Sequence, residues 1–182
     1  MTDTKTNVDE DFIRILQQKV GGEHNRATRA ELRRYWSPTT RHYATMALGK
    51  IGALRSYLSP EALLALLYAE HPEHRPEGAS FGKALLRLAG GNSSSDAFAS
   101  FERHFRRLLA CEGGDLEELS RVLHRFVRRL AKESIPLDYN QLLWDLRKWR
   151  NHSEDVKTQW TRAFYGAPSP ETLLAPATEK PA

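Results

Sequence analysis

Few residues in this sequence have types and spacings that support catalysis or metal binding. The stretch HPEH places His71 and His74 three residues apart with Glu73 between them, and imidazole and carboxylate groups bind ions such as zinc. The surrounding segment, Ala69 to Ser80, is rich in proline and charge, which predicts a loop. A small metal-dependent enzyme using these three residues is therefore one alternative. Because no second paired motif accompanies them, the sequence predicts no bound metal.

Signatures of a nucleophile or of a phosphate-binding loop are lacking as well. The sequence contains no P-loop, no G-x-G-x-x-G and no H-E-x-x-H motif. Cys111 follows the apolar Leu108 and Leu109, which predicts a small packing residue. Glu117 and Glu118 stand where a helix is expected to begin, and the helix dipole accounts for them there. We therefore predict a protein without catalytic residues, cofactors or a small-molecule substrate.

Cationic residues give a stronger signal, because they recur at helical spacing. In LSRVLHRFVRRLAKE, residues 119–133, the apolar side chains share one face and the cations occupy the opposite face, at about 100° per residue. No carboxylate interrupts this basic face before Glu133, whereas a solvated face usually mixes both signs. Three other predicted helices carry similar cationic rows. Each row alone also fits a solvated face, but four together predict a surface that follows a phosphate backbone.

The predicted nucleic-acid-binding residues all lie opposite the apolar faces of their helices. They are Arg26, Arg29, Arg33, Arg34, Lys83, Arg87, Arg103, Arg107, Arg121, Arg125 and Arg128.

Length and composition set further bounds. The 182 residues suffice for one domain or two small ones. Lys and Arg number 27 against 23 Asp and Glu, so the placement of charge matters more than its mild excess. The single cysteine forbids an intramolecular disulfide and fits a reducing compartment. Without a long apolar run or a signal-like N-terminus, we expect a cytoplasmic protein that does not contact the membrane.

Apolar residues follow the helical period over nearly every long segment, and none alternates as a strand would. The sequence therefore predicts an all-α protein of two small helical bundles packed together, over residues 8–90 and 91–166. Residues 167–182 are rich in proline and alanine, which predicts a disordered tail. Helices are expected over residues 9–20, 25–36, 41–51 and 81–88. Another is expected to begin at the Ser59-Pro60-Glu61 start signal. Four more are expected after residue 91, and the last two are IPLDYNQLLWDLRKWR and SEDVKTQWTRAFYG.

Trp144 stands apart from the apolar face that Leu142, Leu146 and Trp149 form at helical spacing. A base could stack on its ring. Tryptophan is also enriched at protein interfaces, and we favour a contact with another helix or subunit.

Four stretches together identify a family resemblance. IPLDYNQLLWDLRKW, WTRAFYG, GKALLRLAG and AELRRYWSP resemble the CasB family, the small subunits of the type I-E CRISPR surveillance complex, Cascade. The resemblance is best from Phe81 to Gly166. Within it, Arg33 and Arg34 match an early arginine pair, and Lys83 takes the basic position of the G-(R/K)-A-L motif. Arg103, Arg107 and Arg121 fall in helices where relatives carry basic residues.

The resemblance implies a non-enzymatic protein that works as a pair of copies beside the other Cascade subunits. Its expected partners are the second copy, the guide RNA, the target DNA and the displaced non-target strand, which together form the R-loop. Base pairing reads sequence in such systems, so the protein need recognise only backbone charge and shape. An alternative function is a helical protein–protein adaptor whose basic faces dock onto acidic partners.

Overall fold

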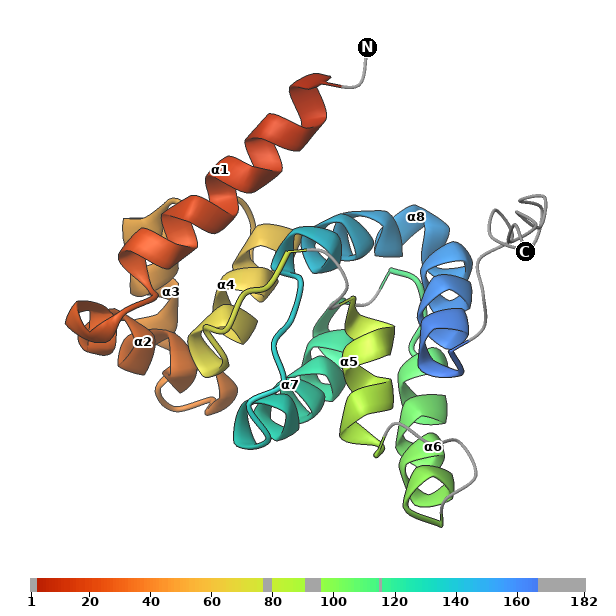
Figure 1. Cartoon of the computed structure of the whole chain (residues 1–182). Coiled ribbons are helices and arrows are strands. Elements are labelled where there is room, and N and C mark those ends of the chain that lie inside the picture. The colour runs from red at the N-terminus through yellow and green to blue at the C-terminus, as the bar shows by residue number, and fades with distance from the viewer. Residues whose placement is uncertain (1–2, 77–79, 91–95, 115, 167–182) are drawn as a thin grey trace, which may run out of the picture.

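The computed structural model describes residues 3–76, 80–90, 96–114 and 116–166, and the regular elements within them are all helical (Figure 1). Apart from one isolated bridge between His74 and Leu137, these residues contain no β-structure. The predicted all-α fold is thus confirmed. The helices are α1 (Asp3–Lys19), η1 (Glu23–Asn25), α2 (Arg26–Arg33), η2 (Arg34–Trp36), α3 (Arg41–Ile51), α4 (Pro60–Glu70), α5 (Phe81–Leu88), α6 (Asp96–Leu109), α7 (Leu116–Lys132) and α8 (Tyr139–Phe164).

Side-chain caps fix the starts of two helices. The Ser59 hydroxyl accepts a hydrogen bond from Ala62 N at 3.1 Å, and Pro60 occupies the first position of α4, as the sequence predicted. In the same way, the Asp138 carboxylate accepts a bond from Gln141 N at 3.1 Å at the start of α8. Two helix boundaries differ from expectation. α1 begins at Asp3 rather than near residue 9, and α8 joins the two segments predicted separately across a bend at His152 (φ −139°, ψ 39°).

α4 lies at the centre of the molecule, between α1–α3 on one side and α5–α8 on the other (Figure 1). Every residue from Glu61 to Ala69 is buried, so this helix is covered all round by α2, α7 and α8. A helix that is apolar on every side must lie in a protein core.

α5 makes a close contact with the second half of α8, and Gly82 permits it. A Cβ atom built on Gly82 would lie 2.5 Å from the Trp160 carbonyl oxygen and 2.6 Å from Ala163 Cβ. No side chain fits in that space, so only glycine allows this approach. The glycine of the GKALLRLAG motif therefore serves helix packing.

The division into bundles at residue 90 stays a prediction. α5 precedes that boundary, yet it packs on α7 and α8, which follow it. The predicted tail, 167–182, lies outside the described residues.

Candidate nucleic-acid interface

The arginines predicted on α2 make contacts within the fold. Arg26 pairs with Glu23 (Nη2 to Oε1, 2.9 Å) on the surface. Arg29 donates from Nη1 to the carbonyl oxygen of Gly22 at 2.6 Å and to that of Val20 at 3.3 Å, just beyond the end of α1. These bonds satisfy carbonyl groups that a helix leaves unpaired at its C-terminus. The guanidinium of Arg29 therefore stabilises this helix end.

Arg33 has a similar role at the C-terminus of α4. Its Nε donates to the Ala69 carbonyl oxygen at 2.8 Å, and its Nη2 donates to that of Glu70 at 3.4 Å. The Glu70 carboxylate also contacts His124 Nε2 of α7 at 3.2 Å, and the His124 ring stacks on Trp36 with centroids 3.9 Å apart. This cluster ties η2, α4 and α7 together. Arg34 instead covers the ring of the exposed Tyr43 at 4.5 Å.

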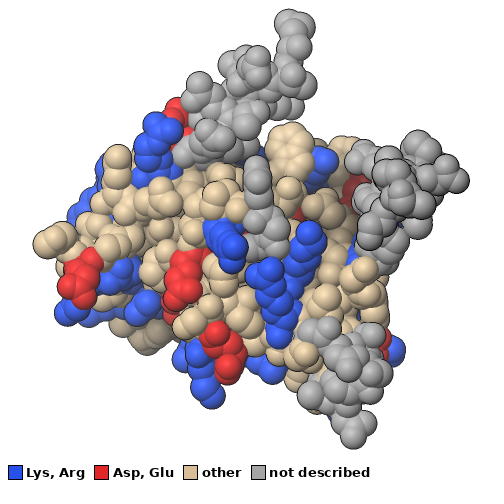
Figure 2. Space-filling view, viewed as in Figure 1, with Lys and Arg blue, Asp and Glu red and all other residues tan. Residues whose placement is uncertain are grey.

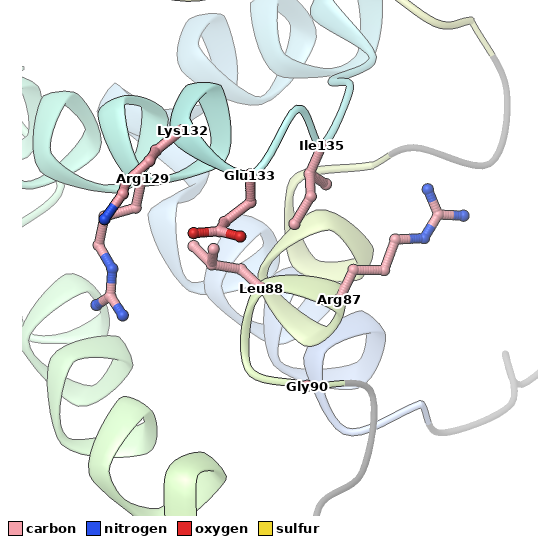
Figure 3. Close-up of a pocket in the computed structure, with 7 residues that line it drawn as sticks. All are labelled: Arg87, Leu88, Gly90, Arg129, Lys132, Glu133 and Ile135. Atoms are coloured by element: carbon pink, nitrogen blue, oxygen red, sulfur yellow. The ribbon is translucent and has the colours of Figure 1, made fainter.

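Lys83 and Arg87 are both exposed on α5. In Figure 2, Lys and Arg side chains gather in the middle of the visible face, over this helix. Arg87, Arg129 and Lys132 line a hollow of about 550 Å³ between α5 and the end of α7, which we call the α5–α7 hollow. Figure 3 shows Arg87 pointing away from the other two cations, with the Glu133 carboxylate between them. The cations of this hollow therefore do not converge on one point.

Three of the five arginines predicted on α6 and α7 line neighbouring hollows. Arg107, Arg125 and Arg129 line a hollow of about 230 Å³, the α6–α7 hollow, together with His104, Val122 and Phe126. Arg103 and Arg107 line a second hollow of about 370 Å³ along α6, which also includes His104 and Ser100. None of the described residues lining these two hollows is acidic.

Neighbouring hollows share residues, so they lie next to one another on the surface. Arg129 lines both the α5–α7 and the α6–α7 hollow, and His104 and Arg107 line both hollows on α6. We call this surface the basic groove; its basic residues are Arg87, Arg103, His104, Arg107, Arg125, Arg129 and Lys132. Three of its arginines, Arg103, Arg107 and Arg125, form no salt bridge with any described residue. Their charges therefore face solvent without a neutralising partner.

Sequence reasoning did not place Arg129, Lys132 or His104 in the site. Arg129 sits at the edge of the basic face of α7, and its guanidinium lies over the Phe101 ring of α6 at 4.8 Å. That contact joins two helices, so the period of one helix could not reveal it. The other two predicted arginines of α7, Arg121 and Arg128, do not line the hollows. Arg121 pairs with Glu117 at 3.1 Å, whereas Arg128 is exposed.

The HPEH segment has partners within the fold. His71 is 2% exposed, and its Nε2 lies 2.7 Å from the Ile135 carbonyl oxygen. Burial lowers the pKa of His74, whose Nδ1 accepts a hydrogen bond from Tyr139 N at 3.2 Å. Both rings thus fasten the segment before α5 to the start of α8. Across the part of the chain that the structure describes, no three His, Cys, Asp or Glu side chains are grouped to hold a metal ion.

Two other predicted side chains have defined surroundings. Cys111 is 1% exposed, which confirms that it lies in the core. Trp144 is partly exposed, with Lys148 Nζ 4.9 Å from its ring centroid. A role for Trp144 in contacting another subunit stays a prediction.

A family model described as CRISPR-associated protein Cse2 matches residues 28–165, which include α3 to α8 and all but the start of α2. The chain belongs to the Cse2 family. A curated relative from Thermus thermophilus, also named CRISPR-associated protein Cse2, is 26% identical over 168 residues, which cover 89% of this chain and 92% of the relative.

Solved structures of Cse2 and CasB proteins have the same fold. A crystal structure of CasB from Thermus thermophilus superposes with a TM-score of 0.65 at 26% identity, covering 87% of this chain and 98% of the other. CasB from Thermobifida fusca, at 22% identity, also gives a TM-score of 0.65, with 88% and 97% coverage, and supports the fold alone. The resemblance to the CasB family that the sequence motifs indicated is therefore confirmed.

No helix among the described residues combines the length and the apolar character that crossing a bilayer requires.

Proposed function

We propose that this Cse2-family chain is a non-catalytic small subunit of the type I-E CRISPR complex Cascade, and that its basic groove holds nucleic-acid backbone. Two copies side by side would extend the groove along the guide RNA–target DNA hybrid and the displaced non-target strand. The observation that carries the proposal is the cluster of arginines on α6 and α7 without salt-bridge partners among the described residues.

Backbone binding is the chemistry that this surface suits best. The groove presents several guanidinium groups along a hollowed path, and its two hollows on α6 lack an acidic lining residue. Guanidinium groups form strong, often bidentate hydrogen bonds with phosphate oxygens. A row of them binds a polyanion irrespective of its base sequence, because phosphate contacts carry no sequence information.

Modest contacts of this kind are enough to matter in an R-loop. Forming the loop exchanges a DNA duplex for an RNA–DNA hybrid of similar stability. Contacts that hold the displaced strand disfavour its re-annealing and shift this nearly balanced exchange toward the open loop. The groove thus contributes stability to the loop without any chemical step.

The test is to replace Arg103 and Arg107 by glutamate in Cascade assembled with a guide RNA. We expect the variant subunit to be incorporated but the R-loop to dissociate faster and form less completely. Loop occupancy can be followed by the permanganate reactivity of unpaired thymines in the displaced strand. An unchanged R-loop in a fully assembled complex would overturn the proposal.

The matched control carries the same change of charge elsewhere. Arg14 lies on α1 and Arg55 follows α3, and both side chains are exposed. Neither residue lines the groove. Replacing both by glutamate changes the net charge by as much as the Arg103→Glu/Arg107→Glu variant does, and it should leave the R-loop intact. Equal loss in both variants would assign the effect to net charge rather than to the groove, and this too would count against the proposal.

A further inference from the structure

The α6–α7 hollow has an apolar wall, which phosphate binding alone does not require. Val122 and Phe126 of α7 line it together with Arg107, Arg125, Arg129 and His104. A phosphate group gains nothing from contact with valine and phenylalanine side chains. The lining instead combines a cationic rim with an apolar surface, which suits a flat, partly apolar group attached to an anionic chain.

The size of the hollow narrows the choice of ligand. Its volume of about 230 Å³ lies below the roughly 300–1,000 Å³ of pockets for drug-sized ligands. It corresponds to roughly eight water molecules at about 30 Å³ each. A single nucleobase fits within this space, and because the hollow is open to solvent, the attached sugar and phosphate can lie outside it.

Arg129 supplies a stacking platform at the edge of this hollow. Its guanidinium carbon lies 4.8 Å from the centroid of the Phe101 ring, so the guanidinium lies over this ring of α6. Figure 3 shows the side chain leaving α7 and extending toward α6. A planar guanidinium held on one side stacks readily on a second ring at its other face. Phe101 is buried, and the Arg129 guanidinium lies over its ring in the protein without a ligand.

We infer that the α6–α7 hollow takes one unpaired base of a single strand, stacked on Arg129 and against Val122, while Arg103, Arg107 and Arg125 contact the adjoining phosphates. The inference rests on the proposed function and adds to it a ligand class. A base within a duplex is stacked between its neighbours and paired, so only an unpaired strand can place a base in the hollow without a further cost. The groove therefore recognises the bases of an open strand as a class, independently of their sequence.

The test compares three DNA probes bound to the purified full-length chain, with affinities measured by fluorescence anisotropy at one low salt concentration. The probes are a 15-nucleotide oligo-dT, an abasic strand of the same length and a 15-base-pair duplex. The first two carry the same backbone charge, so their ratio isolates the contribution of the bases. One stacked base should make oligo-dT bind about five-fold or more tightly than the abasic strand.

Two variants locate that preference in the hollow. Val122→Phe fills the space without changing charge, and Arg129→Lys keeps the charge but removes the planar group. Circular dichroism confirms that each variant folds, and Arg129→Lys, an exposed position, remains informative if Val122→Phe does not fold. In both, we expect the ratio of oligo-dT to abasic affinity to fall toward one, because oligo-dT binding weakens more than abasic binding does.

The outcomes separate this inference from the proposed function. If the wild-type chain binds oligo-dT and abasic DNA equally, the base site is wrong, while weaker binding of both by Arg103→Glu/Arg107→Glu would still support backbone binding. If that charge-reversed variant binds both probes as tightly as the wild type, the proposed groove is wrong and the base site fails with it. A base preference that both hollow variants retain would place the stacking elsewhere and overturn the inference.

Discussion

Asp145 is fully buried on α8, and its carboxylate joins the two halves of that bent helix. Its Oδ2 accepts a hydrogen bond from Trp160 Nε1 at 2.7 Å, and its Oδ1 accepts one from Gln141 Nε2 at 2.8 Å. Burial raises the pKa of Asp145 to about 6, although these two hydrogen bonds and the nearby Lys148 act in the opposite direction. The Trp160 bond spans the bend at His152 and so helps to fix the angle between the halves.

This raised pKa predicts a pH dependence of stability. The ordinary pKa of 3.8 applies in the unfolded chain, so between pH 4 and 6 the folded state binds more protons than the unfolded state. The free energy of unfolding should therefore fall as the pH rises from 4 to 6, by about 2 kcal/mol. Urea unfolding of the wild type and Asp145→Asn at pH 4, 5, 6 and 7 measures the difference. A difference that stays constant with pH would contradict this origin.

Single residues also show where the sequence was informative and where it was not. Helical periodicity correctly placed Arg103 and Arg107 on the solvent side of α6. It also predicted Arg33 as a binding residue, which stays a prediction, and it did not reveal that Arg33 donates to the carbonyl group of Ala69, 36 positions along the chain. Such a pairing depends on how α2 and α4 cross, which no local pattern contains. Arg129 was left out for the same reason, since its partner Phe101 lies on another helix.

At the scale of elements, local signals predicted some helix ends and missed others. Ser59 and Pro60 fixed the start of α4 because capping acts within one turn. The bend at His152 has no proline or glycine to mark it, so no local signal predicted it. α1 begins at Asp3, within a polar stretch that lacks an apolar period. The all-α class could be predicted because apolar periodicity persists over long segments. How the helices cross could not be predicted, because no single segment contains that information.

Alanine substitutions at two helical glycines should change the free energy of unfolding in opposite directions. At Gly82 of α5, a methyl group would clash with the Trp160 carbonyl and with Ala163 of α8, so Gly82→Ala should lower the free energy of unfolding by about 1–3 kcal/mol. At Gly49 of α3, a Cβ atom meets nothing within 4 Å, so Gly49→Ala should raise it by up to about 1 kcal/mol through helix propensity. Chemical denaturation measures both. Similar effects at the two sites would show that α5 does not approach α8 as closely as described.

At the scale of the whole molecule, the predicted cations fall into two groups on either side of α4. On α2, Arg29 and Arg33 satisfy backbone carbonyl groups at the ends of α1 and α4. On α6 and α7, Arg103, Arg107 and Arg125 have no such partners among the described residues and line the basic groove. A charge already bonded within the fold must give up those bonds before it can contact a phosphate. The binding free energy should therefore come mainly from the groove.

The salt dependence of binding distinguishes these two groups. For a single strand, the slope of log K against log salt concentration is about −0.7 for each phosphate neutralised. Arg103→Gln/Arg107→Gln should therefore make the slope of oligo-dT binding less negative by about 1.4. The matched pair Arg26→Gln/Arg34→Gln removes as much charge from α2 and η2, where Arg26 pairs with Glu23 and Arg34 covers Tyr43, and should change the slope less. Titrations from low to moderate salt measure both slopes. If the α2 pair altered the slope and the groove pair did not, the nucleic acid would have to follow the α1–α3 side of the molecule, because a slope counts the phosphates actually neutralised.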